Sequence, residues 1–177
     1  MYEKIKSKIR TIPNWPKNGV MFRDITTLLQ DAPMFNHTIQ MLKERYTNVE
    51  IDIIVGIESR GFIIGSALAH SLNKGFVPIR KKGKLPYETE SQEYELEYGT
   101  DIIEIHKDAI KKGQKVLLVD DLLATGGTSS AACKLIEKLG GQLVECCFVI
   151  DLPDLGGRKK LEENGYPVFS LVEFEGE

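Results

Sequence analysis

The sequence lacks the features that would mark a membrane, secreted or nucleic-acid-binding protein. No apolar run approaches the roughly 18 residues that a membrane-spanning helix needs. The basic N-terminus leads into TIPNWPKNG, and not into an apolar core with a cleavage site, so we do not expect a secretory signal. Basic residues are not in excess, since 23 Lys and Arg face 26 Asp and Glu and the net charge is −3. We therefore expect no nucleic-acid or membrane partner, and any anion must be bound by a local cluster.

Cysteine is also scarce. The three cysteines, Cys133, Cys146 and Cys147, are an odd number, show no zinc-binding spacing and lie in apolar contexts. This usage indicates reduced core thiols, and we expect a cytoplasmic protein. The chain is 177 residues long and 42% apolar, which is enough for one core. We find no repeat, low-complexity tract or interdomain linker, and expect a single domain over residues 1–177.

Helical and strand-like segments alternate after about residue 30. Asp31 is placed to cap a helix through Tyr46, and helices are also expected from about residue 60 to Gly75 and over 128–139. Short apolar runs predict strands at 51–57, 76–80, 101–106, 115–120, 143–150 and 168–172. This rhythm predicts an α/β fold with a central, mostly parallel sheet and helices on both faces.

Two segments fall outside the rhythm, residues 1–30 and residues 81–100. The second is rich in charge and weak in period, and such a segment inside a compact domain is usually a functional lid or a long hairpin. A solvated charged excursion is the remaining alternative.

The stretch Val116–Thr128, VLLVDDLLATGGT, joins a predicted strand to a predicted helix. Ligands of open parallel sheets bind beyond the carboxyl ends of the strands, which is where Asp120 and Asp121 fall. The small residues that follow offer backbone amides at a helix N-terminus, which favours a phosphate. A ribose would satisfy both features, with its 5′-phosphate in the loop and its hydroxyl groups at the aspartates. From composition alone, a strand and helix joined by an acidic turn is an equal alternative.

The same stretch resembles the 5-phosphoribosyl-1-diphosphate (PRPP) motif of the type I phosphoribosyltransferases. This resemblance favours the ribose phosphate interpretation and implies the fold of that family, with a small hood from about residues 1–30 plus the C-terminal segment and a flexible lid loop at about 81–100. Three more stretches are similar to the adenine-using members: GVMFRDIT (19–26), GIESRGF (56–62), and RKKGKLP (80–86) with LEYG (96–99). They follow that branch's order and spacing, so the resemblance covers nearly the whole chain.

The resemblance implies a role for each matching residue. The 5′-phosphate and ribose would be held by Asp120, Asp121, Ala124, Thr125, Gly126, Gly127 and Thr128, and the diphosphate by Ser59, Arg60, Arg80, Lys81 and Lys84. Adenine would stack on Phe22 and be read by the Met21 carbonyl and the Arg23 amide, with Leu155 over the base. By composition alone, a plain core segment is the preferred explanation of Met21 and Phe22, and solvated charge is the alternative for the basic residues.

The resemblance also implies the catalytic pair. Glu97 and Tyr98 would close over the substrate, with Glu97 exchanging a proton at purine N7. The 6-oxopurine enzymes typically carry an Asp at the position of Ala124, so hypoxanthine and guanine become poor candidates as substrates. The implied reaction is Mg²⁺-dependent transfer of phosphoribosyl from PRPP to adenine, giving AMP and diphosphate, by a homodimer.

Other functions stay open at this point. A non-catalytic regulator could sense PRPP with the same site, but such regulators carry an added nucleic-acid-binding domain and do not need Glu97. The same chemistry on xanthine conflicts with the base-reading segment. A generic nucleotide-binding module would leave residues 81–100 unexplained.

Overall fold

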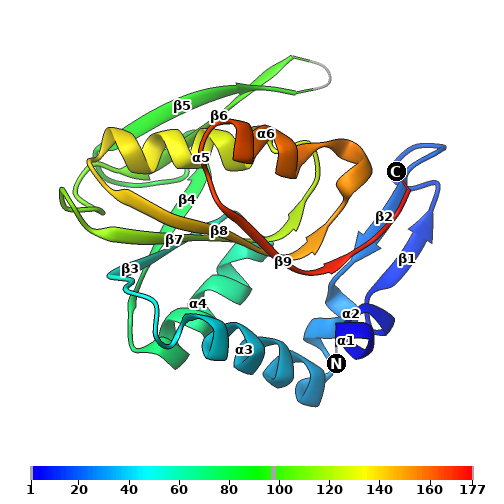
Figure 1. Cartoon of the computed structure of the whole chain (residues 1–177). Helices are drawn as coiled ribbons and strands as arrows, with labels where there is room; N and C mark the ends of the chain where they lie inside the picture. Colours follow the sequence, from blue (N-terminus) through cyan, green and yellow to red (C-terminus); the bar gives the residue numbers. More distant parts are fainter. Residues whose placement is uncertain (1, 97–98, 177) are drawn as a thin grey trace.

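The centre of the protein is a seven-stranded sheet with the strand order β5-β6-β4-β3-β7-β8-β9 (Figure 1). The computed structural model describes residues 2–96 and 99–176. Five strands run parallel, namely β4 (Gly75–Lys81), β3 (Ile53–Ile57), β7 (Lys115–Leu123), β8 (Gln142–Asp151) and β9 (Val168–Glu173). At one edge β6 (Thr100–His106) pairs antiparallel with β4, and β5 (Thr89–Glu95) pairs antiparallel with β6.

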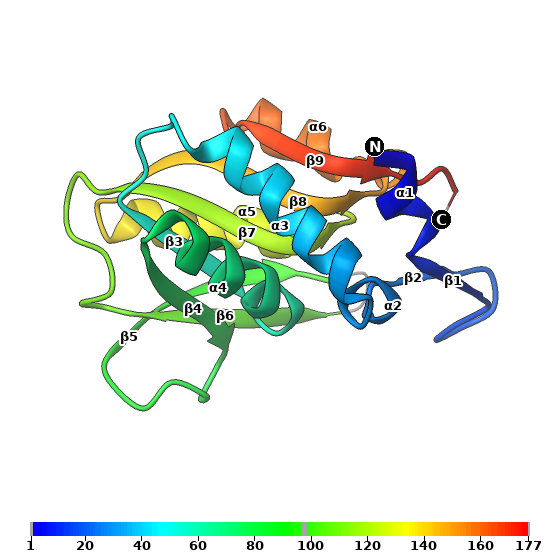
Figure 2. The same cartoon turned by 90° about the horizontal axis from the view of Figure 1, so that it is seen from below.

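Helices cover both faces of the sheet (Figures 1 and 2). α3 (Ala32–Tyr46) and α4 (Arg60–Leu72) pack on one face, while α5 (Gly127–Lys138) and α6 (Gly157–Glu163) pack on the other. Successive side chains of β7 alternate between the two cores, with Leu117 and Val119 facing α3 and α4 and Val116 and Leu118 facing α5. A strand buried on both faces must be apolar at every position, and this explains the unbroken VLLV run.

Local signals set the helix ends. The carboxylate of Asp31 accepts a hydrogen bond from the amide of Met34 (3.1 Å) and caps α3. α5 ends at Lys138 and is followed by a left-handed glycine, Gly140 (φ +83°), and the Gly141 amide donates to the Ile136 carbonyl. α4 ends at Leu72, because Asn73 takes the left-handed conformation (φ +55°). The helix is therefore shorter than predicted, since we expected it to end near Gly75.

The N-terminal elements form a separate layer beside the sheet. α1 (Tyr2–Ser7) and α2 (Thr26–Leu29) flank the two-stranded sheet of β1 (Arg10–Pro13) and β2 (Met21–Asp24). The C-terminal residues lie against this hairpin, where Arg23 donates to the Glu175 carbonyl (2.9 Å) and its guanidinium lies 4.6 Å from the Phe174 ring centroid. The Gly176 amide donates to Asp154 in the short 3-10 helix η1 (Pro153–Leu155), so the C-terminal segment connects β2 to η1.

The predicted α/β fold is confirmed, and each predicted strand is present within a few residues of its expected ends. Strand β7 continues through both aspartates to Leu123, beyond the predicted end at Asp120. Residues 81–100 contain β5, which pairs with β6, so the described part of this span forms a long hairpin. The closure of this hairpin over the site as a lid stays a prediction. The hood and the single-domain assignment also stay predictions. Within residues 2–96 and 99–176, no helix is long and apolar enough to cross a membrane.

Candidate active site

The carboxyl ends of β3 and β7 open into one polar cavity of about 530 Å³. β3 and β7 are parallel neighbours, so the residues that follow them are brought to the same edge of the sheet. The Glu58–Ser59 peptide bond, which is cis, leads from β3 into α4. The cavity is lined by Glu58, Ser59, Arg60, Lys81, Lys84, Asp120, Asp121 and Leu122.

The two aspartates are held in one arrangement by their neighbours. The Asp121 amide donates to Asp120 Oδ1 (2.8 Å), and Arg60 Nε donates to Asp121 Oδ2 (2.5 Å). A Cβ on Gly61 would lie 2.8 Å from Asp120 Oδ1, so only glycine allows α4 to start this close to β7. Burial, and then the charge of Asp121, raises the pKa of Asp120 well above its ordinary value.

The basic residues at the end of β4 surround a carboxylate that our sequence interpretation did not assign to the site. Arg80 Nε donates to Glu58 Oε2 (3.3 Å), the Lys81 amide donates to the same oxygen (3.0 Å), and Lys84 forms an ion pair with Oε1. The Lys81 ammonium lies 3.0 Å from Asp101. Burial raises the pKa of Glu58, but the hydrogen bonds from Lys84, Lys81 and Arg80 outweigh burial and hold it below its ordinary value. Glu58 lies inside the stretch GIESRGF (56–62), which resembles the family. Its position directly before Ser59 and Arg60 was the sequence feature that could have assigned it to the site.

The loop from Ala124 to Thr128 has the geometry expected of a phosphate cradle. Gly126 is left-handed (φ +77°), and α5 begins directly after it, at Gly127, so the first amides of the helix have no partner within the helix. The loop packs on Gly157 of α6, whose amide donates to the Ala124 carbonyl (3.0 Å). A Cβ on Gly157 would overlap that carbonyl and lie 2.9 Å from the Gly126 amide nitrogen. Gly157 is thus needed for the position of the loop, and the sequence pattern did not reveal this role.

The β5–β6 hairpin lies over the start of α5. A Cβ on Gly127 would lie 3.3 Å from the Glu95 carbonyl oxygen, and the Lys138 ammonium of α5 donates to the Ser91 carbonyl (2.9 Å). The predicted catalytic residues Glu97 and Tyr98 follow β5 in the sequence but lie outside the described residues. The last described residues of β5 therefore lie beside the first residue of α5.

The predicted base-reading residues lie on β2 and η1. Met21 is 36% exposed, and the ring of Phe22 meets Trp15 edge to face with centroids 4.4 Å apart. Leu155 is partly buried against the core that α3 and α4 cover. Phe22 thus has aromatic support on one side, and the C-terminal segment connects its strand to the helix that carries Leu155.

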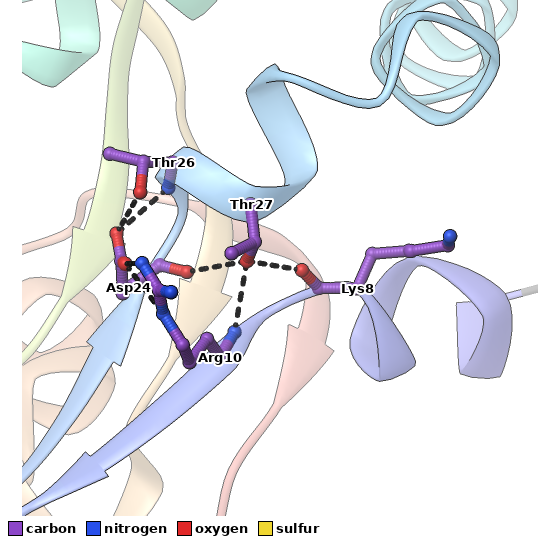
Figure 3. A network of polar contacts seen from close by, with 5 residues as sticks. All are labelled: Lys8, Arg10, Asp24, Thr26 and Thr27. Carbon is purple, nitrogen blue, oxygen red and sulfur yellow. Dashed lines mark hydrogen bonds and ion pairs between the residues drawn. The ribbon is translucent and has the colours of Figure 1, made fainter.

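A network of hydrogen bonds anchors the end of β2 (Figure 3). Asp24 accepts two hydrogen bonds from Arg10 (3.1 and 2.5 Å) and two from the amide and hydroxyl of Thr26 (2.9 and 2.6 Å). The Thr27 hydroxyl donates to the Lys8 carbonyl (2.6 Å) and accepts from the Arg10 amide (3.2 Å). These bonds tie β1, β2, α1 and α2 into one unit beside the residues expected to bind the base.

The sequence matches the family described as the phosphoribosyl transferase domain over residues 24–175. A protein of Chlorobium phaeobacteroides named adenine phosphoribosyltransferase is 62% identical over 175 residues, which are 98% of this chain and 99% of the relative. A protein of Nitrosospira multiformis with the same name is 62% identical over 173 residues, with the same coverage. This chain belongs to the adenine phosphoribosyltransferase family.

Solved structures of that family share the fold. The crystal structure of adenine phosphoribosyltransferase from Thermoanaerobacter pseudethanolicus superposes with a TM-score of 0.94 at 53% identity, covering 98% of this chain and 100% of that chain. The enzyme from Saccharomyces cerevisiae, complexed with D-2,5-dideoxy-2,5-imino-altritol 1,6-bisphosphate and adenine, has a TM-score of 0.90 at 43% identity, with coverages of 97% and 98%. The resemblance that the motifs suggested is therefore confirmed for the family and the fold, while the role of each site residue stays a prediction.

The structure brings the residues expected to bind PRPP close together, whereas the residues expected to bind adenine lie on separate elements. Seven of the former come together at the edge formed by β3, β4 and β7: Ser59, Arg60, Arg80, Lys81, Lys84, Asp120 and Asp121. The loop Ala124, Thr125, Gly126, Gly127 and Thr128 follows β7 directly. Met21, Phe22 and Arg23 lie on a different sheet, and the C-terminal residues connect this sheet to η1.

Proposed function

We infer that this protein transfers the phosphoribosyl group of PRPP to N9 of adenine, giving AMP and diphosphate. One observation carries the inference: a cavity with paired aspartates and a basic cluster adjoins a phosphate loop in a chain about 60% identical, over nearly its whole length, to adenine phosphoribosyltransferases. The activity is that of a pentosyltransferase in purine salvage.

PRPP would bind along the edge of the sheet. Its 5′-phosphate would enter the loop Ala124–Thr128, where the helix dipole and free amides favour a dianion. Its ribose hydroxyls would meet Asp120 and Asp121, and its diphosphate would lie among Ser59, Arg60, Arg80, Lys81 and Lys84. This placement is supported by the cavity, which both aspartates and most of these basic residues line, and by the loop that follows β7.

Adenine would be read by the backbone of β2. In an extended strand the peptide groups of residues i and i+2 point to the same edge, so the Met21 carbonyl and the Arg23 amide share one edge of β2. An acceptor facing the exocyclic amine and a donor facing N1 select a 6-amino purine, since a 6-oxo purine reverses both groups. Phe22 would stack on the ring, and Leu155 would cover its other face.

The described residues suit a Mg²⁺ ion that is bound mostly by substrate. In this part of the chain no group of three or more His, Cys, Asp or Glu side chains could hold a metal, while Asp120 and Asp121 offer oxygen atoms in the cavity. Mg²⁺ commonly uses one or two carboxylates together with phosphate oxygens. When bound with PRPP, the ion would neutralise charge on the diphosphate.

Catalysis would rest on positioning, charge and exclusion of water. The transition state resembles an oxocarbenium ion, so Arg60, Lys81 and Lys84 would stabilise the departing diphosphate while Asp120 and Asp121 orient the ribose. Glu97 would exchange the proton at N7, and Tyr98 would close the site with the hairpin.

Product formation with four bases tests this function. The protein is mixed with PRPP, Mg²⁺ and adenine, hypoxanthine, guanine or xanthine, alongside Glu97→Gln and the control Glu93→Gln, which alters an exposed residue of β5. We expect AMP as the only nucleotide, a loss of roughly 10²-fold in kcat for Glu97→Gln and no change for the control. Binding of PRPP without product from any base would instead indicate a sensor.

The assembly and location also belong to the proposal. The family resemblance supports a homodimer, which light scattering on the purified protein would test. Free cysteines at positions 133, 146 and 147 support a cytoplasmic location.

A further inference from the structure

Glu58 occupies the centre of the basic cluster. It follows β3 directly, and its own amide donates to the Ile79 carbonyl of β4 (2.9 Å), so the backbone fixes its position between the two strands. Its two carboxylate oxygens accept from the Arg80 guanidinium, the Lys81 amide and the Lys84 ammonium. An anion entering the cluster would use the same donors.

The turn that carries these cations is also held by two hydrogen bonds that do not involve Glu58. The Gly83 amide donates to the buried carboxylate of Glu104 (3.0 Å), and the Lys82 amide donates to the Ile102 carbonyl (3.0 Å). Both bonds attach the turn to β6. Removal of the Glu58 charge therefore leaves these two attachments of the turn in place.

Each cation of the cavity already faces a carboxylate. Arg60 is paired with Asp121, Lys81 with Asp101, and both Arg80 and Lys84 with Glu58. Asp101 and Asp121 each pair with one cation, but Glu58 pairs with two cations and also accepts a hydrogen bond from a backbone amide. Its carboxylate is thus the group that a diphosphate must displace most completely.

We propose that Glu58 is an internal competitor for the diphosphate group, which lowers the affinity of the basic cluster for free phosphate and diphosphate. This inference rests on the proposed function, since it assigns the cluster to the diphosphate of PRPP. PRPP overcomes the competition because its ribose and 5′-phosphate bind elsewhere in the same site, whereas a free anion has only the cluster. Glu58 thereby acts as a specificity residue and keeps the product diphosphate from being retained.

The proposal is tested by whether loss of the Glu58 charge raises or lowers the affinity for diphosphate. Inorganic diphosphate and inorganic phosphate are titrated calorimetrically into the full-length wild-type protein and Glu58→Gln at constant Mg²⁺. We expect Glu58→Gln to bind diphosphate roughly three- to tenfold more tightly, because two partly exposed ion pairs no longer compete. Glu58→Asp keeps the charge but withdraws it by one methylene group, and we expect an affinity between those of the other two proteins.

Glu50→Gln is the matched control. Glu50 also pairs with a lysine, Lys115, but precedes β3 and so lies at the opposite end of that strand from Glu58. It makes the same change in net charge, and we expect the wild-type affinity for diphosphate.

Weaker or unchanged diphosphate binding in Glu58→Gln, with the wild-type melting temperature, would overturn the proposal and show that Glu58 instead orders the cations for the ligand. If Glu58→Gln does not fold, wild-type affinity in Glu58→Asp would overturn it equally. If the wild type does not convert adenine but still binds diphosphate, the proposed function is refuted. The diphosphate affinities of the wild type and Glu58→Gln would still decide whether Glu58 competes with the anion. A wild type that does not bind diphosphate would refute both.

Discussion

The carboxylate of Asp24 gives a stability prediction that can be worked out from its contacts. The side chain is 10% exposed and accepts hydrogen bonds from Thr26 and Arg10 (Figure 3). The hydroxyl of Thr26 is the largest cause that lowers the pKa of Asp24, and burial opposes it. Together with Arg10, the contacts lower the pKa from 3.8 to about 2.

The change from 3.8 to about 2 corresponds to about 2.4 kcal/mol of folding free energy. Because the Arg10 side chain is 57% exposed, solvent screening reduces the expected contribution to about 1–2 kcal/mol. The folded-state pKa is depressed, so this stability is fully present above the unfolded pKa of 3.8 and is lost as the pH falls through about 2. Half of it should be gone at about pH 3.

Asp24→Asn removes the charge and keeps the size of the side chain. We expect its free energy of unfolding in urea to be about 1–2 kcal/mol lower than that of the wild type at pH 7 and pH 5, with the gap closing toward pH 3. Asp108→Asn, which alters an exposed turn residue, should match the wild type at every pH. A gap that stays constant down to pH 3, or the absence of a gap at pH 7, would refute this reasoning.

Two further substitutions test contacts that hold the site together. Gly157→Ala should raise the KM for PRPP by about tenfold or more, because its Cβ would displace the Ala124–Gly126 loop, whereas Gly75→Ala, with no atom closer than 3.7 Å, should leave KM unchanged. An unchanged KM for Gly157→Ala would mean that the loop can move freely. Arg158→Met should lower the free energy of unfolding by about 3–5 kcal/mol, because it leaves the fully buried Asp151 carboxylate without its partner at 2.8 Å. Asp151→Asn combined with Arg158→Met should recover part of that loss in urea denaturation, and the absence of recovery would show that packing of Arg158 dominates.

Several parts of the fold were predictable because the determining residues are neighbours in the sequence. The VLLV run of β7 is apolar on both faces, and Asp31 caps α3 through an amide only three residues away. Strand β5 was not predicted, because TESQEYE is half-exposed and contains no apolar residue other than Tyr94. Its pairing with β6 supplies the stabilisation that its own sequence does not show.

The strand–loop–helix geometry of the proposed phosphate loop was predictable for the same reason, since strand, aspartates, glycines and helix follow one another within Val116–Thr128. The partners of the loop and of the basic cluster were not. Gly157 packs on the loop, and Glu58 meets Lys84, only because the sheet order and the return of the C-terminal segment bring these residues together.

The sequence by itself determined the alternation of strands and helices and the family, and it supplied the residues that we propose to bind PRPP and adenine. Only the tertiary structure decided which charges face each other, that the Glu58 carboxylate lies among Arg80, Lys81 and Lys84, and that β2 is anchored through Asp24. The physical reason is that periodicity and capping act over a few residues, whereas the electrostatics of a site depend on distances between segments far apart in the chain.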